Sequence, residues 1–436
     1  MRMKTWAAIG AALILPFLHG CGNDDAQKGF VRIINATTEY TSLDLYTLNS
    51  DGGNDLLISG TAAGAASAYT GIDKGSYTFN VKSSTSTGAA TPVSGTVSKE
   101  DHFSIVTYLT GSTTKTQFLT DEEAHPASNN AKLRILNAAP SEAASVDVYL
   151  TSSDCTALEV TDTAFATAVG TTVTAYSQVT AAAAGTPYNV CVFAAGDTST
   201  LLLDIPALKL KDQEIATLIL THTSGGVLIN GSVLDQQGAY TTYANTIARV
   251  RVVADAANAA AVTVTVNGED LATSAPSPSV GDYMTVAVGT LSPTITIGGA
   301  TASGFTPPTI AAGNDYTLLV TGTSGAPAAF LITDVNIPST NLTNTVRARV
   351  VNGLNGTNGA VSVTIDGRSI GSATAFGTAS TYTNIPPSSG TSTVHATTTG
   401  TQPADLLSKT FTGGNVYTIF VYGDATAPTI APFADR

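Results

Sequence analysis

The stretch VRIINATTEYTSLDLY, residues 31–46, decides the fold because it carries two strand signals separated by a short polar connection. Its first part is rich in aliphatic residues around Arg32, and its last part, LDLY, alternates apolar and polar side chains. β-Branched residues favour strands, and strict alternation predicts a strand with one buried and one solvated face. The stretch therefore predicts an all-β fold.

The same pattern occurs four times at intervals of roughly 100 residues, which indicates a repeated unit. An arginine followed by two aliphatic residues begins each copy, at Arg32, Arg134, Arg251 and Arg349. The alternating strands that follow are LDLY, VDVY, VTVT and VSVT. A Tyr-x-x-aliphatic segment comes next, starting at Tyr69, Tyr176, Tyr283 and Tyr382. A long apolar run, such as IATLILTHT at 215–223, lies near the end of each copy.

Each unit contains about seven short strands separated by turn signals, without helical periodicity. We therefore predict an all-β chain of four tandem immunoglobulin-like antiparallel β-sandwich domains. A β-propeller is the alternative architecture, but propeller blades are only about 40 to 50 residues long. The predicted boundaries are a signal peptide at 1–20, a linker at 21–28, and sandwich repeats at 29–126, 127–243, 244–340 and 341–436.

The N-terminal segment predicts export and lipidation. A basic MRMK is followed by an apolar run at residues 6–18, which is too short to span a bilayer of about 30 Å. The run ends in LHGC, which resembles the bacterial lipobox, although His19 departs from the usual small residue. The resemblance implies a lipoprotein signal peptide, cleavage before Cys21, acyl anchoring through that residue, and, with Gly22 after it, the outer membrane. An ordinary signal peptide with an incidental Cys21 is the alternative.

Composition excludes some classes of partner. The 436 residues carry a net charge of −13, and only 12% of them are charged, while 43% are hydrophobic. An acidic chain without a basic stripe is a poor ligand for a phosphate backbone, so we do not expect nucleic-acid binding. The hydrophobic share is large enough to build cores, which argues against disorder.

The remaining cysteines, Cys155 and Cys191, form an even pair in what is predicted to be an oxidising compartment. We expect a disulfide between them, and two buried free thiols are the alternative. The spacing does not reproduce the disulfide of antibody domains, which packs against a buried Trp, because Trp6 in the signal segment is the only Trp.

Chemistry-bearing motifs are sparse. The histidines lack zinc-ligand spacing and no Gly-x-Ser-x-Gly motif is present, so we predict neither an enzyme nor a cofactor. Asp51, Asn54 and Asp55 in NSDGGNDLL offer oxygens to calcium, but their spacing differs from an EF-hand loop and a β-turn explains the same residues.

The four repeated arginines admit two interpretations. One is a repeated ligand site. The other, which we favour, is a structural arginine on the solvated face of the first strand, hydrogen-bonded to neighbouring elements. Asp44 and Asp147 would offer carboxylates in the first two copies, but Thr263 and Ser362 replace them in the last two.

Taken in order, the arginine strand, VDVY, Tyr-x-x-aliphatic and the tyrosine-led apolar run resemble the bacterial family known as domain of unknown function 4397. The resemblance covers nearly all of the chain after the signal segment and implies extracytoplasmic β-sandwich repeats, often on lipoproteins, with no established activity. We therefore expect a lipid-anchored envelope protein with a structural, adhesive or partner-binding role. A carbohydrate-binding or calcium-dependent adhesion module is the alternative. The envelope protein or glycan partner is not specified by the sequence.

Overall fold

The computed structural model describes residues 27–436 except 50, 86–89, 111–112, 159–160, 182–183, 305, 307, 340–343, 357–358 and 399–402. Strands dominate these residues, and the sheets are sandwich-like, as predicted. The predicted ranges are called repeats 1 to 4 below; their exact boundaries stay a prediction. Within the described residues, no helix is long and apolar enough to cross a membrane.

Repeats 1 and 2 each contain two sheets, and the strands that they share follow the same order. We call the sheet that includes the arginine strand the pairing sheet and the other one the outer sheet. The pairing sheet of repeat 1 contains β1 (Lys28–Asn35), β4 (Ala65–Ala66), β5 (Thr70–Asp73), β8 (His102–Thr110) and β9 (Thr113–Thr120). Its outer sheet contains β2 (Ser42–Leu48), β3 (Asn54–Ala62), β6 (Gly75–Ser83) and β7 (Thr91–Val97). The pairing sheet of repeat 2 contains β10 (Asn130–Asn137), β13 (Ser177–Thr180), β16 (Ile215–His222), β17 (Ile229–Asp235) and β18 (Tyr240–Tyr243). Its outer sheet contains β11 (Val146–Thr151), β12 (Ala166–Val169), β14 (Thr186–Ala194) and β15 (Leu201–Leu210).

Repeats 3 and 4 reproduce this topology. The pairing sheet of repeat 3 contains β19 (Ile247–Ala256), β22 (Ser279–Val280), β23 (Met284–Ala287), β28 (Asp315–Thr323) and β29 (Ala326–Asp334). Its outer sheet contains β20 (Val262–Val266), β21 (Glu269–Ala275), β25 (Pro293–Ile297) and β26 (Ala300–Ala302), with a short sheet of β24 (Gly289–Thr290) and β27 (Thr309–Ile310) and a 3-10 turn at Ala257–Ala259. Repeat 4 has a pairing sheet of β30 (Val346–Asn352), β33 (Thr383–Ile385), β36 (Val416–Asp424) and β37 (Ala427–Ala434), and an outer sheet of β31 (Val361–Ile365), β32 (Arg368–Thr374), β34 (Ser392–Thr398) and β35 (Ala404–Lys409).

Most strand pairs are antiparallel, but each pairing sheet contains one parallel pair. The arginine strand lies parallel to the long apolar strand near the end of the same repeat: β1 with β8, β10 with β16, β19 with β28, and β30 with β36. The chain builds the whole outer sheet between these two strands, so the second one enters the pairing sheet in the same direction as the first.

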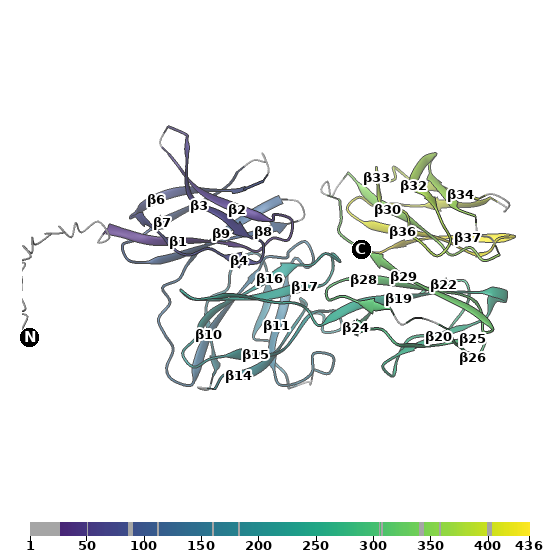
Figure 1. The fold of residues 1–436 in the computed structure, drawn as a ribbon, viewed down its shortest axis with the longest axis horizontal. Coiled ribbons are helices and arrows are strands. Elements are labelled where there is room, and N and C mark those ends of the chain that lie inside the picture. Colours follow the sequence, from purple (N-terminus) through teal and green to yellow (C-terminus); the bar gives the residue numbers. More distant parts are fainter. Residues whose placement is uncertain are drawn as a thin grey trace, which may run out of the picture.

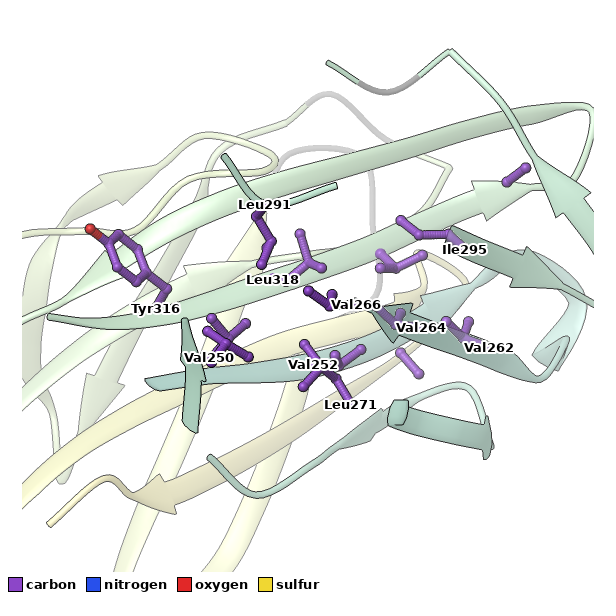
Figure 2. Packing of buried hydrophobic residues seen from close by; sticks show 14 of the residues in the cluster. Val250, Val252, Val262, Val264, Val266, Leu271, Leu291, Ile295, Tyr316 and Leu318 are labelled. Carbon is purple, nitrogen blue, oxygen red and sulfur yellow. The ribbon is translucent and has the colours of Figure 1, made fainter. Parts of the chain in front are cut away.

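A hydrophobic core fills the space between the two sheets of each repeat. In repeat 3, shown in Figure 2, Val250 and Leu318 of the pairing sheet pack with Val264 and Ile295 of the outer sheet. The alternating strand β20 has the burial pattern expected of one buried face, because Val262, Val264 and Val266 point into the core and the threonines between them do not. Comparable clusters form the cores of the other repeats.

The repeats associate as two face-to-face pairs, with repeat 1 on repeat 2 and repeat 3 on repeat 4 (Figure 1). Within each pair, the second faces of the two pairing sheets pack against each other. Ile34 and Val106 of repeat 1 share one apolar cluster with Ile219 of repeat 2. Val253 and Leu319 of repeat 3 likewise pack with Phe420 and other residues of repeat 4. The central strands are therefore buried on both faces, and all eight residues of β16 are buried.

The two pairs meet where repeat 2 joins repeat 3. Asn245 is buried in this joint and donates to the carbonyls of Leu202 and Ile229, at 2.7 and 2.9 Å. The hydroxyl of Thr223 donates to the carbonyl of Gly313, at 2.8 Å, and so ties repeat 2 to repeat 3. The connection between repeats 2 and 3 includes strand β18.

Candidate functional site

The repeated arginines lie on the faces where the repeats pair. Their exposed fractions are 2% for Arg32, 6% for Arg134, 1% for Arg251 and 2% for Arg349. The expectation of a solvated face is therefore wrong, because that face of the first strand packs against the neighbouring repeat. A buried guanidinium requires hydrogen-bonding and charged partners, so its surroundings explain how the pairs hold together.

The same two contacts surround every repeated arginine. Its Nε donates to a hydroxyl on the adjacent parallel strand, and the distances are 2.7 Å to Ser104, 2.9 Å to Thr217, 2.8 Å to Thr317 and 3.0 Å to Thr418. Its guanidinium carbon lies over the tyrosine of the Tyr-x-x-aliphatic segment, at 4.6 Å for Tyr69, 4.4 Å for Tyr176, 4.5 Å for Tyr283 and 4.9 Å for Tyr382. Guanidinium–aromatic stacking of this kind is favourable when the site is desolvated. We call each set an arginine cluster.

Three of the clusters also contain an aspartate from the end of the repeat. The strand hydroxyl donates to Asp121 in repeat 1, to Asp334 in repeat 3 and to Asp435 in repeat 4, at 2.5, 2.7 and 2.5 Å. In repeat 2 the strand register places Gln236 at the equivalent position. Its side chain exchanges two 2.8 Å hydrogen bonds with the backbone of Glu123 in the connection after repeat 1.

In repeats 3 and 4 the clusters are reciprocal. Arg251 of repeat 3 donates to Asp435 of repeat 4 at 2.6 Å, and Arg349 of repeat 4 donates to Asp334 of repeat 3. Arg349 also donates to the carbonyl of Thr333, at 2.8 Å. Each repeat therefore supplies a cation to its partner and receives one in return.

In repeats 1 and 2 the contacts across the interface involve backbone carbonyls. Arg32 donates to the carbonyls of Gly238 and Asp235, at 2.6 and 3.1 Å, and Arg134 donates to the carbonyl of Thr120, at 3.2 Å. Asp121 is the nearest carboxylate to both arginines, at 3.7 and 4.0 Å. This interface thus has one central carboxylate instead of two.

The pKa values of the arginines differ between the two interfaces, because the carboxylates lie at different distances from them. Burial alone would lower the pKa of Arg349, but the adjacent Asp334 reverses the effect and raises it. Burial lowers the pKa of Arg134, because its carboxylate neighbour is more distant. Burial and then Asp334 raise the pKa of Tyr283 well above its usual value, so its hydroxyl stays protonated and donates to Asp334 at 2.5 Å.

The arginine clusters can crosslink repeats but offer little to a ligand. Their guanidinium, hydroxyl and carboxylate groups already bond to one another in a buried interface. Removing one charged partner from such a buried pair typically lowers stability by about 3–5 kcal/mol, because the other charge is then left unpaired. The geometry supports the structural interpretation of the arginines over a repeated ligand site.

The two aspartates considered as arginine partners have other roles. Asp44 accepts hydrogen bonds from the Gly60 amide at 2.8 Å and the Ser84 hydroxyl at 2.6 Å. Asp147 accepts from the amides of Ala168 and Gly196, at 2.7 and 2.9 Å. Both carboxylates hold loops of the outer sheets and lie away from the arginine clusters.

The calcium candidates lie at the tip of the β2–β3 hairpin. Asp51 Oδ1 accepts from the amide of Gly53 at 3.0 Å, as in a turn, and Asn54 Oδ1 accepts from Asn80 at 2.6 Å. Asp55 is exposed on β3. Across the part of the chain that the structure describes, no group of three or more His, Cys, Asp or Glu side chains is placed to hold a metal ion.

A disulfide joins Cys155 and Cys191, as predicted. Cys191 lies on β14 and points away from the repeat 2 core, into a small cluster with Phe193, Leu201 and Ile247. The disulfide therefore fixes the loop between β11 and β12, which carries Cys155, to strand β14 of the outer sheet. Ile247, the first residue of β19, lies beside the bridge. Cys21, the predicted lipidation site, lies outside the described residues.

The cluster aspartates were not anticipated from the sequence, although a signal exists. Asp121, Asp334 and Asp435 each follow the strand Ser or Thr of their cluster by 17 residues. Repeats 3 and 4 also carry a second arginine two positions before the repeated one, and Arg249 and Arg347 stack on Tyr283 and Tyr382, at 4.6 and 4.1 Å.

Among the solved structures that this chain resembles are two with low TM-scores. A proposed adhesin from Bacteroides ovatus is 8% identical, with a TM-score of 0.16 and an alignment that covers 49% of this chain and 94% of that chain. The Bacillus anthracis TIE protein is 10% identical, with a TM-score of 0.14 and coverage of 91% and 69%. Similarities at these scores support no conclusion about this chain. A search of curated proteins found no match.

The sequence profile of one family matches two separate regions, residues 29–149 and 248–354, which together make up just over half of the chain. Each region contains nearly all of one repeat and also the arginine strand of the next repeat. The spacing of the two matches agrees with a tandem repeat. The chain belongs to the family described as Domain of unknown function (DUF4397).

Proposed function

We propose that this chain is a lipid-anchored, extracytoplasmic envelope protein with a structural, adhesive or partner-binding role, and that it is not an enzyme. One observation carries the proposal: the polar residues that recur in every repeat are used to hold the repeats together. Arg251 and Arg349 with their aspartates are the clearest case, because all four side chains are buried between two repeats.

Such an arrangement suits a rigid spacer or platform. Paired sandwiches keep the outer sheets and the loops facing solvent in a fixed geometry, and loops on a rigid scaffold commonly carry binding functions. Four sandwiches packed as two pairs resist bending more strongly than four sandwiches joined only by linkers, since large apolar interfaces limit relative motion.

Anchoring and location are part of the same proposal. We infer that Cys21 becomes the acylated first residue, and that the eight-residue segment 21–28 holds repeat 1 close to an outer membrane. The support is the lipobox-like LHGC after a short apolar run. Two or more acyl chains would give stable attachment, whereas a single chain gives only marginal binding.

The test is to express the full chain in a Gram-negative host fed a clickable palmitate analogue. We expect the wild-type protein to carry the label and to fractionate with membranes. The Cys21→Ser variant should carry no label and should no longer fractionate with membranes, while its Cys155–Cys191 disulfide still forms. Protease shaving of intact cells then reports which face of the membrane carries the repeats. An unlabelled wild-type protein that fractionates as soluble would contradict the anchoring.

A carbohydrate-binding adhesion role is the second candidate. It is favoured by a cleft between repeats 1 and 2 that has tyrosines on its lining. Calcium dependence has less support, because Asp51 and Asn54 are already engaged in local hydrogen bonds.

A further inference from the structure

A cleft of about 370 Å³ lies where repeat 1 meets repeat 2. One side is formed by the chain directly after β1, at Ala36–Thr38, and by Gly64. The other side is formed by the β16–β17 hairpin, at Thr221 and Asn230. Pockets of roughly 300–1,000 Å³ with apolar walls and a few polar groups are typical of small-ligand sites.

Strand β18 gives this cleft an aromatic wall. It pairs with β17 and places Tyr240, Thr242 and Tyr243 on the lining. Both tyrosines are partly buried from opposite sides of the strand, Tyr240 against the apolar cluster between repeats 1 and 2 and Tyr243 against the core of repeat 2. The other three pairing sheets, within the described residues, end at the strand equivalent to β17 and have no such addition. The aromatic wall is therefore a property of repeat 2 and is not needed for the repeated fold.

Repeats 3 and 4 form a cleft of about 340 Å³ at the corresponding position, which shows that pairing itself creates this space. It lies between the end of β19 and the β36–β37 hairpin, as the first cleft lies between the end of β1 and the β16–β17 hairpin. The chemistry differs, however, because Asp255 and Asp424 line the second cleft and no tyrosine does. Only the first cleft has the aromatic surface.

The first cleft is chemically neutral. Its lining residues are all uncharged, and Thr221 and Thr242 contribute hydroxyl groups, whereas the hydroxyls of Thr37 and Thr38 bond to Asn35 and His222. Glu39 and His222, which follow the lining residues Thr38 and Thr221 in the chain, pair with each other at 3.2 Å. Asn230, also on the lining, accepts through Oδ1 from the backbone amide of Asn245 at 2.9 Å, and its carboxamide nitrogen is a donor group.

These features match a neutral sugar ring. Such a ring has an apolar face that can pack on tyrosine and a rim of hydroxyls that can bond to threonine and asparagine groups, whereas a charged ligand would lose its hydration without compensation. We propose that the cleft between repeats 1 and 2, walled by Tyr240 and Tyr243, binds a neutral saccharide unit of a larger glycan. The proposal stands independently of lipid anchoring.

The test uses soluble chain beginning at residue 22, with neutral oligosaccharides of glucose and of N-acetylglucosamine as probes and an acidic oligogalacturonate as the charged comparison. Saturation-transfer NMR detects contact, and titration calorimetry measures affinity. Thr242→Trp fills the cleft from an exposed position on β18. Thr241→Trp is the matched control, because Thr241 is the exposed neighbour on the same strand and does not line the cleft.

We expect at least one neutral oligosaccharide to bind, Thr242→Trp to weaken that binding more than about tenfold, and Thr241→Trp to leave it within about twofold. Circular dichroism melting of both variants establishes that each is folded. Three results would overturn the proposal: no transfer to any neutral probe, equal affinity in wild type and Thr242→Trp, or binding only of the acidic probe.

Discussion

Removing the charge of Asp435 is the most informative perturbation of the paired architecture. Asp435 is the penultimate residue of the chain, yet it is buried and accepts from Arg251 at 2.6 Å and from Thr418 at 2.5 Å. Asp435→Asn keeps the size of the side chain, removes its charge and replaces one acceptor with a donor. The arginine of repeat 3 then loses its closest anion.

The expected cost follows from the geometry. Leaving a buried charge unpaired costs about 3–5 kcal/mol. Asp334 remains 3.8 Å from Arg251 and compensates in part, so we expect the lower end, about 3 kcal/mol of unfolding free energy. The interface contains other apolar contacts, including Phe420 and Val253, so the loss should weaken the pair without preventing folding.

The assay is guanidinium denaturation followed by circular dichroism, combined with hydrogen exchange of β30 and β36. The matched control is Asp424→Asn, because Asp424 is exposed in the same repeat and accepts from Thr426 in a local turn. We expect that control to change stability by no more than about 0.5 kcal/mol. A double variant, Arg251→Met with Asp435→Leu, should recover much of the loss, since replacing both members of a buried pair is often neutral.

A loss below about 1 kcal/mol for Asp435→Asn would refute the reasoning, because no buried charge would then have lost its partner. An effect equal to that of Asp424→Asn would do the same. The reasoning would also be refuted if the unfolding free energy fell while hydrogen-exchange protection of β30 and β36 stayed normal, because the substitution would then act elsewhere in the chain.

Three further outcomes are expected. Burial raises the pKa of Asp255 to about 8, so the folded chain keeps a proton that the unfolded chain releases above about pH 4. The stability that this proton contributes is complete below about pH 4 and is lost as pH rises through about 8. Asp255→Asn should therefore flatten the decline of the melting temperature over this pH range. Replacing both Cys155 and Cys191 with Ala should cost about 4 kcal/mol by the loop-entropy relation, measured by denaturant unfolding, and a cost near zero would mean that the bridge constrains nothing. Arg134→Ala should cost about 2 kcal/mol in the same assay, since it removes two hydrogen bonds and a stacked ring contact, and full stability would count against the structural role.

The sequence predicts the fold well because the repeated signals are local. Alternation in VTVT at 262–265 directly indicates one buried face, and the structure has that face in the core. The disulfide is equally accessible to reasoning, because an even pair of cysteines in a chain predicted to be exported has few alternatives.

Pairing of the repeats was harder to foresee because it depends on contacts between distant segments. Arg251 and Asp435 are 184 residues apart in the chain. One signal was nevertheless available: runs such as IATLILTHT are apolar without alternation, and such runs are typical of strands buried on both faces. An arginine inside a doubly buried strand then requires a partner from another repeat.

The cleft with its tyrosine wall could not be predicted from the sequence. Tyr240 and Tyr243 lie in a segment that is polar and short, which is typical of a linker between domains. They become a wall only because β18 pairs with β17 and because repeat 1 covers the other side.

Small-angle X-ray scattering of soluble chain from residue 22 tests the face-to-face pairing most directly. A compact chain of this length has a radius of gyration of about 22 Å, and a flat array of two pairs should lie modestly above it, below about 30 Å. A row of four separate 100-residue domains would instead give a value on the order of 40 Å. The paired architecture predicts the first result, and the second would contradict it.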